Sequence, residues 1–165
     1  MRLVMLGGAP GVGKTSVARA LLGLMAGGDP LVQWIDVDAL WQHQPWRVDD
    51  RTKLMLRRNL QAVLANADAA GVDVVIVTWV YQSGEFHKLV ADLAPLNSET
   101  FTVQLRASAT VWRERFALDA ARPAIDAFYE HRYVAAQSTP ADHIIETDGL
   151  SVTQMATMIL RLLNS

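Results

Sequence analysis

The feature that most constrains this chain is a glycine-rich segment that directly follows its first apolar run. Residues 8–15 read GAPGVGKT and satisfy the pattern G-x-x-x-x-G-K-[ST] in full. The apolar run at 3–6 precedes this segment, and a helical pattern of apolar residues begins at Lys14. The glycines let the backbone turn its N–H groups inward around an anion, and the start of the helix adds partial positive charge. The sequence therefore predicts a phosphate-binding turn between a buried strand and a helix.

The side chains of residues 8–15, called the phosphate loop below, indicate ATP with Mg²⁺ as the ligand. Lys14 can reach the β- and γ-phosphates and is a candidate catalytic residue, and the Thr15 hydroxyl can bind Mg²⁺. The chain lacks the N-K-x-D signature that a guanine-binding protein would be expected to carry. The residues expected to contact the nucleotide here are Gly8, Ala9, Pro10, Gly11, Val12, Gly13, Lys14, Thr15 and Ser16.

Short apolar runs alternate with helical patterns, which predicts a single α/β domain over residues 1–165. The run VVIV at 74–77 is apolar throughout, so both faces of that strand are expected to be buried. Helices between consecutive strands imply right-handed crossovers and a parallel sheet with helices on both faces. Strands are expected at 3–6, 31–35, 72–78, 101–105 and 143–146, and helices at about 14–26, 50–70, 84–93, 109–120 and 124–137 and from Ser151 onward, with Gln154 completing a capping box.

Composition limits the partners of the chain. Apolar residues make up 51% and charged residues 19% of the 165 residues, and the net charge is −2. No block of lysine and arginine is present, so we expect no nucleic-acid partner. The absence of cysteine excludes disulfides and thiolate metal sites. No apolar stretch approaches the roughly 20 residues of a membrane span, and the N-terminal run is too short for a signal peptide, so we expect a cytoplasmic protein without a membrane partner.

Two carboxylates, Asp36 and Asp38, follow the second expected strand. In an open parallel sheet, ligands lie outside the carboxyl ends of the strands, so both carboxylates are expected near the γ-phosphate if the second strand neighbours the first. One of them can hold Mg²⁺ or its water, and the other can accept a proton from a substrate hydroxyl. The alternative is an ordinary turn at the end of a strand, where aspartate is common.

With the phosphate loop and the D-x-D at 36–38, the chain resembles the small P-loop kinases that include shikimate, gluconate and adenylylsulfate kinases. The resemblance implies the three-layer αβα sandwich of P-loop NTPases, with a five-stranded parallel sheet in the order 2-3-1-4-5. It also implies transfer of the γ-phosphate of ATP to a hydroxyl of a small molecule. By the same resemblance Asp36 binds magnesium, and Asp38 is a catalytic residue that contacts the acceptor hydroxyl.

The second half of the chain is similar to tunicamycin-resistance ATP-binding proteins of the TmrB type, and more distantly to chloramphenicol phosphotransferase. The similarity lies in VIVT at 75–78 with Phe86 downstream, and in DHIIETDGLS at 142–151. It implies that Thr147 and Asp148 border the adenine of the nucleotide. It also suggests an antibiotic-like acceptor, and thereby a role in antibiotic resistance, beside a nucleoside or a sugar.

The kinase resemblance places a short lid at about 113–124, between the fourth and fifth strands. Arginines in such a lid supply positive charge over the migrating phosphoryl group. Arg115 corresponds to the arginine on the helix that leads into the lid, and Arg122 to one on the lid itself. The alternative is that these are solvated helix arginines.

The acceptor is expected to bind beside Asp38, where aromatic and basic residues follow the second and third strands. Trp41, Arg47, Arg57 and Trp79 are the candidates, and they would suit a flat or anionic molecule. Shikimate kinases carry a glycine-rich turn after the third strand, whereas this chain has TWVYQS at 78–83, which argues against shikimate.

Two functions remain open at this point. The first is a small-molecule kinase, acting as a monomer or homodimer. The second is a nucleotide-binding or slowly hydrolysing P-loop switch with a tryptophan-rich partner surface. Asp38 discriminates between them, because a kinase needs a group that orients or deprotonates the acceptor hydroxyl and a switch does not.

Overall fold

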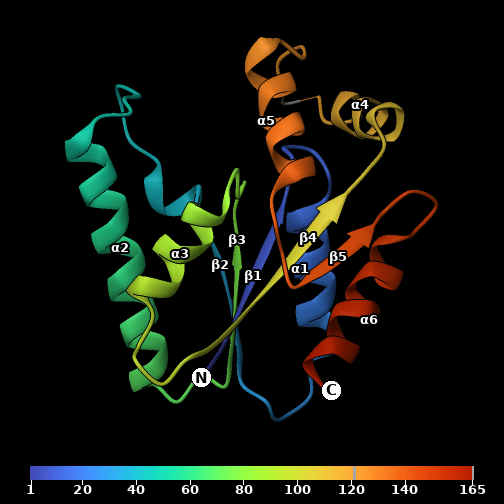
Figure 1. The fold of residues 1–165 in the computed structure, drawn as a ribbon. Helices are drawn as coiled ribbons and strands as arrows, with labels where there is room; N and C mark the ends of the chain where they lie inside the picture. Colours follow the sequence, from blue (N-terminus) through green and yellow to red (C-terminus); the bar gives the residue numbers. More distant parts are fainter. Residues whose placement is uncertain (121, 165) are drawn as a thin grey trace.

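The computed structural model describes residues 1–120 and 122–164, in which five parallel strands form one sheet flanked by helices (Figure 1). The strand order is β2-β3-β1-β4-β5. This confirms the α/β class and the order 2-3-1-4-5 expected from the sequence. The strands are β1 (Arg2–Gly8), β2 (Val32–Asp36), β3 (Val74–Thr78), β4 (Glu99–Arg106) and β5 (His143–Glu146).

The helices cover both faces of the sheet. Alternate residues of β1 belong to two separate cores: Val4 and Leu6 pack with α1 and α6, whereas Leu3 and Met5 pack with α2 and α3. This division follows from the period of two in a strand. The helices are α1 (Lys14–Leu24), α2 (Asp50–Ala69), α3 (Gly84–Leu93), α4 (Ala109–Ala117), α5 (Ala127–Ser138) and α6 (Val152–Leu163), with a 3₁₀ turn η1 (Ala39–Trp41).

Strand β1 extends beyond the apolar run at 3–6, because the two glycines that follow this run continue the backbone pairing with β4. Gly7 pairs with Gln104, and Gly8 pairs with Leu105. A Cβ atom added at Gly7 would lie 2.0 Å from Gln104 Oε1, so the side chain of Gln104 fills the space that a larger residue would need. The first strand therefore leads directly into the phosphate loop.

The observed helix ends agree better with the capping residues than with the ends predicted from the apolar pattern. Ser151 and Gln154 form the expected capping box of α6. The helix expected at 109–120 ends at Ala117, and the one expected at 124–137 begins only at Ala127. Asp126 sets that start, because its carboxylate accepts the N–H groups of the first turn of α5.

The predicted lid at 113–124 covers the end of α4 and the connection to α5; its residue Ala121 lies outside the described residues. None of the helices among the described residues is both long and apolar enough to cross a membrane.

Candidate nucleotide and acceptor site

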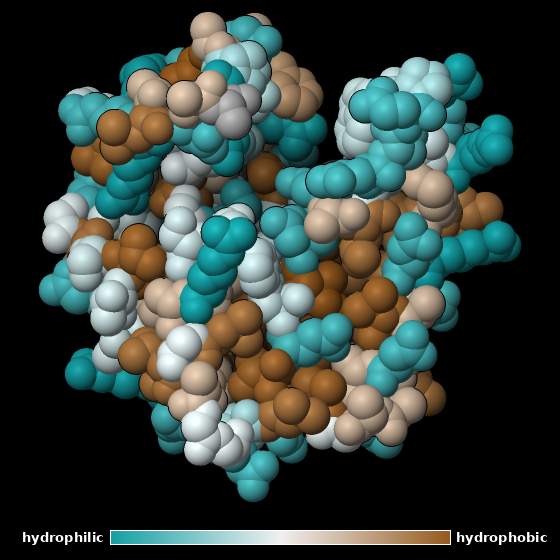
Figure 2. Space-filling model, turned by 180° about the vertical axis from the view of Figure 1, so that it is seen from behind, coloured by the Kyte–Doolittle hydropathy of each residue, from teal (hydrophilic) through white to brown (hydrophobic). Residues whose placement is uncertain are grey.

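The candidate site lies at the carboxyl ends of β1, β2 and β3. The phosphate loop follows β1, and Asp36 ends β2 opposite Thr78 at the end of β3. Helices α4 and α5 rise on one side of this edge, and η1 and the start of α2 lie on the other (Figure 1). From behind, the surface has a notch between these two parts (Figure 2). This is the edge at which open parallel sheets bind ligands.

The phosphate loop is held in shape by α4. The indole Nε1 of Trp112, which is fully buried, donates to the Pro10 carbonyl at 2.7 Å. Gly11 has a φ of 83°, and a Cβ atom there would lie 2.9 Å from the ring of Phe116. Trp112 and Phe116 lie one turn apart on α4. Both side chains therefore contact the backbone of the phosphate loop and hold its shape. Trp112 is not among the site residues predicted from the sequence, although its spacing of four from Phe116 places both aromatic rings on one face of a helix.

Lys14 is turned back into the loop. Its Nζ donates to the carbonyls of Gly8 and Ala9 at 2.9 and 3.0 Å. Burial lowers the pKa of Lys14 to about 8, and Asp38 acts in the opposite direction. The amino group is thus placed where a γ-phosphate could replace carbonyl oxygens as its partner.

The two aspartates are brought together at the end of β2. The Asp38 backbone N–H donates to Asp36 Oδ1 at 3.1 Å, and the Val37 N–H donates to the Thr78 carbonyl. Burial, and then the charge of Asp38, raise the pKa of the Asp36 carboxyl above its ordinary value. Asp38 is exposed and begins η1.

These groups fit a magnesium ion better than an all-protein metal centre. Within the described residues, no three His, Cys, Asp or Glu side chains converge. Mg²⁺ usually takes one or two carboxylates, together with substrate phosphates and waters. A divalent cation would offset the repulsion between Asp36 and Asp38 that raises the pKa of Asp36. The Thr15 hydroxyl follows Lys14 at the start of α1 and could supply a further oxygen.

Arg115 and Thr147, both expected in the site, contact each other. The Arg115 Nη1 donates to Thr147 Oγ1 at 2.7 Å, and its Nη2 donates to the Thr147 carbonyl at 2.8 Å. Asp148 Oδ1 accepts the Ser108 N–H at 3.0 Å, and the hydrogen bonds from Ser108 lower the pKa of the Asp148 carboxyl. The loop after β5 is therefore tied to the helix that also holds the phosphate loop.

Arg122 lies on the same side. Its Nε donates to Asp119 Oδ2 at 2.9 Å, and its Cζ lies 5.2 Å from the centre of the Phe116 ring. Arg115 and Arg122 both line a hollow of about 430 Å³ beside the phosphate loop. Its lining also includes Gly11, Gly13, Lys14, Thr15, Ser16, Leu118 and Asp119. The structure thus brings the expected phosphate and lid residues to one place.

The expected acceptor residues are not gathered in the same way. Trp79 is 8% exposed and packs edge-on against Tyr81 and Phe86 in the core beneath α2 and α3. Trp41 is half-buried in η1, with its ring 5.4 Å from that of Trp46.

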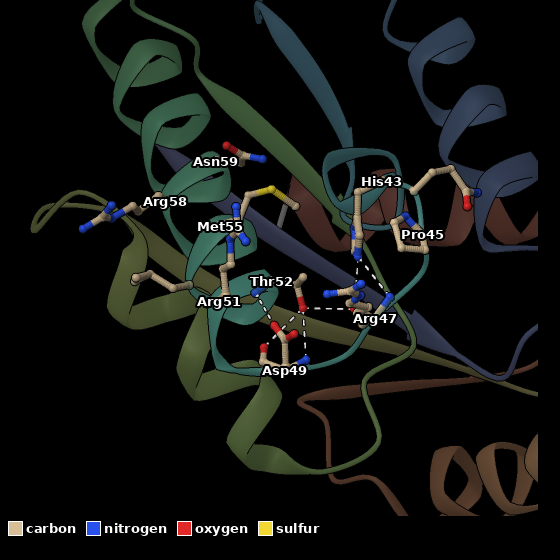
Figure 3. A pocket seen from close by; sticks show the side chains of 11 residues that line it. His43, Pro45, Arg47, Asp49, Arg51, Thr52, Met55, Arg58 and Asn59 are labelled. Atoms are coloured by element: carbon tan, nitrogen blue, oxygen red, sulfur yellow. Dashed lines mark hydrogen bonds between the residues drawn. The ribbon is translucent and has the colours of Figure 1, made fainter.

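Arg47 lies in a separate hollow of about 560 Å³, between the loop at 43–47 and the first half of α2 (Figure 3). Arg58 and Asn59 line this hollow from α2, whereas Arg57 is exposed and is not among its lining residues.

A further arginine near the site, Arg132 on α5, was not singled out by the sequence. It is half-buried, and its Cζ lies 4.1 Å from the centre of the Phe128 ring. Burial lowers the pKa of the Arg132 guanidinium, whereas Asp38 acts in the opposite direction. A single arginine inside an otherwise ordinary helix gives no signal in one sequence.

The chain matches no known protein family by sequence, and it matches no curated protein. Among solved structures, a sugar kinase from Janibacter sp. HTCC2649 superposes with a TM-score of 0.73 at 15% identity, covering 99% of this chain and 95% of the other. The tunicamycin resistance protein of Deinococcus radiodurans gives 0.69 at 21% identity, covering 98% and 95%. A gluconokinase from Sinorhizobium meliloti 1021 gives 0.66 at 15% identity, covering 97% and 91%.

The protein therefore has the fold of the small P-loop kinases. Shikimate and adenylylsulfate (APS) kinases also match this fold along nearly the whole chain. At these identities the likeness concerns the fold alone.

Proposed function

We propose that the protein is an ATP- and Mg²⁺-dependent phosphotransferase that moves the γ-phosphate to a hydroxyl group of a small molecule. The observation that carries this proposal is the electrostatic interaction between Asp38 and Lys14. Lys14 is half-buried in the phosphate loop after β1, and Asp38 is exposed beyond the end of β2, which β3 separates from β1. A nucleotide-binding protein without an acceptor has no need of that carboxylate.

The proposed reaction is a single in-line displacement. The acceptor oxygen forms a bond to the γ-phosphorus while the bond from that phosphorus to the bridging oxygen of ADP breaks. The hydroxyl proton passes to Asp38, and ADP leaves with the electron pair of the broken bond. Lys14 and the backbone N–H groups of the phosphate loop hold the phosphates and offset their charge.

The proposal also assigns the remaining ligand contacts. Thr15 and Asp36 would hold magnesium, which supplies charge neutralisation on the β- and γ-phosphates when bound. Arg122 lines the hollow beside the phosphate loop and is proposed to act on the phosphates. Because both terminal nitrogens of Arg115 already donate to Thr147, we propose that Arg115 acts by positioning the loop at Thr147 and Asp148 beside the adenine.

The acceptor is proposed to be a hydroxylated nucleoside, sugar or antibiotic-like molecule that enters beside Asp38. A sugar kinase and a tunicamycin resistance protein among the structural neighbours support these classes. Trp41 and Arg47 stay candidates for acceptor contacts on the η1 side. Arg57 and Trp79 stay predictions from the sequence, although Trp79 would have to be reached from within a packed core.

The test is a screen of hydroxylated metabolites and antibiotics for acceptor-dependent release of ADP from ATP. Lys14→Ala should abolish both nucleotide binding and turnover, whereas Lys88→Ala, which removes an exposed lysine on α3, should change neither. Asp38→Asn should bind ATP normally and lose transfer. Unchanged ATP affinity and activity in Lys14→Ala would refute the proposal.

A second candidate function is a nucleotide-dependent switch. The observation in its favour is the exposed apolar surface beside η1, where Trp46 is 59% and Val48 is 56% exposed. Transfer by Asp38→Asn at the wild-type rate would remove Asp38 from the role of base, whereas slow hydrolysis that no acceptor accelerates would favour the switch over the kinase.

A further inference from the structure

Helix α5 is fixed over the carboxyl ends of the central strands by two buried contacts. Gln104 Nε2 donates to the Ala136 carbonyl at 2.8 Å, and Gln104 pairs with Gly7, directly before the phosphate loop. Thr139 Oγ1 donates to the Tyr81 carbonyl at 3.0 Å, beyond the end of β3. The face of α5 that carries Ala136 and Thr139 therefore points at the sheet.

Arg132 lies on the same face of α5, one turn before Ala136. One turn advances about 5.4 Å along a helix, and the N-terminal end of α5 points away from the sheet, above the strand ends (Figure 1). Long helical side chains lean toward the N-terminus, in agreement with the contact between Arg132 and Phe128. The guanidinium is thus held beyond the carboxyl ends of the strands.

The charges around Arg132 show which groups share this space. Arg132 lowers the pKa of Lys14, and Asp38 favours the charged form of Arg132 and so acts to raise its pKa. The guanidinium therefore lies within electrostatic reach of both the phosphate-loop lysine and the acceptor-side carboxylate.

Among the described residues, the N–H donors of Arg132 have no partner, in contrast to those of Arg115 and Arg122. Arg115 donates to Thr147, and Arg122 donates to Asp119. In the part of the chain that the structure describes, the Arg132 guanidinium makes no hydrogen bond and no ion pair, and only the Phe128 ring contacts its face. No nitrogen of Arg132 is among the buried unpaired atoms of the described residues, so its donors are open to solvent and available to a ligand.

We propose that Arg132 contacts the phosphoryl group as it passes from ATP to the acceptor. The inference rests on the proposed function and deepens it by naming a catalytic residue on α5. In such a transfer, negative charge spreads over the three equatorial oxygens of the migrating group, between the leaving and attacking oxygens. A guanidinium fork that reaches that position from α5 would form bonds that strengthen in the transition state.

The test compares two affinities in the presence of Mg²⁺: that for ADP, and that for ADP with aluminium fluoride, which occupies the position of the migrating phosphoryl group. Arg132→Gln is expected to leave ADP affinity unchanged and to weaken the fluoride complex about 10- to 100-fold, the usual range for a lost hydrogen bond to a charged group. Arg132→Lys should recover part of the loss, because it keeps the charge but not the fork.

Arg161→Gln serves as the matched control, because it removes an exposed arginine from α6 and should change neither affinity. An unchanged affinity of Arg132→Gln for the fluoride complex would overturn the inference. An equal loss for ADP alone would also overturn it, since that result indicates a purely structural role. Failure of the wild-type protein to bind ADP would instead overturn the proposed function itself, so the two failures are distinguishable.

Discussion

Replacing Trp112 by phenylalanine tests whether α4 holds the phosphate loop in its binding shape. The substitution removes the only donor in the contact between Trp112 Nε1 and the Pro10 carbonyl, which lies in a buried environment. A buried acceptor left without its donor costs about 1–3 kcal/mol. The smaller ring also leaves a cavity beside Tyr133, whose ring stacks on the indole at 4.4 Å, and this adds about 1–2 kcal/mol, as for the deletion of one or two buried methylene groups.

The free energy of unfolding of Trp112→Phe should therefore fall by about 2–5 kcal/mol. For a chain of this length this lowers the melting temperature by roughly 5–15 °C. If re-ordering the released loop takes about 1 kcal/mol, ADP affinity falls about fivefold. Urea unfolding and calorimetric titration with ADP measure the two effects.

Tyr133→Phe is the control for this prediction. Tyr133 Oη donates to the Ala107 carbonyl at 3.0 Å, but Gln137 Nε2 donates to the same oxygen at 3.0 Å, so no acceptor is left unpaired. The control should lose about 1 kcal/mol or less and keep its ADP affinity. If Trp112→Phe binds ADP as tightly as Tyr133→Phe does, the idea that the indole shapes the loop is wrong.

Two further predictions concern the core around the site. Gly7→Ala should lower the free energy of unfolding by about 1–3 kcal/mol in urea unfolding, because the new Cβ would displace the buried Gln104 side chain, and wild-type stability would contradict this. Burial lowers the pKa of His87, with Asp142 opposing, so the native state favours the neutral ring. The contribution of His87 to stability is present above its unfolded pKa and is lost as the pH falls toward the lower folded pKa. Urea unfolding between pH 7.5 and 5 should show this loss, with a slope of at most about 1.4 kcal/mol per pH unit from this group, and His87→Gln should remove it.

Much of the fold could be predicted because its signals are local. The strand run at 74–77 is apolar on both faces, and the structure buries both. The capping box of Ser151 needs only residues three apart. The boundaries of α4 and α5 were less accurate, because the apolar pattern continues past Ala117, whereas the Asp126 cap fixes where α5 begins.

The burial of the aromatic residues predicted to contact the acceptor could not be read from the sequence. Trp79 and Trp41 look equivalent as aromatic residues just beyond strand ends, yet one packs in the core with Phe86 and the other lies half-buried beside Trp46. Whether a tryptophan is packed or available depends on which helix covers it, and that is decided by elements far away along the chain.

The phosphate loop and the place of Asp36 and Asp38 after the second strand could be predicted because each depends on residues that are adjacent or nearly adjacent in the chain. The parallel sheet could be predicted because strand and helix patterns alternate along the chain. The surroundings of these residues depend on contacts between segments that lie far apart in the chain. Trp112 reaches Pro10 across 102 positions, and Arg115 reaches Thr147 across 32. Such contacts depend on how the crossovers stack helices over the strand ends, so the periodicity of a single segment does not encode them. The same stacking places Arg132 within electrostatic reach of Lys14.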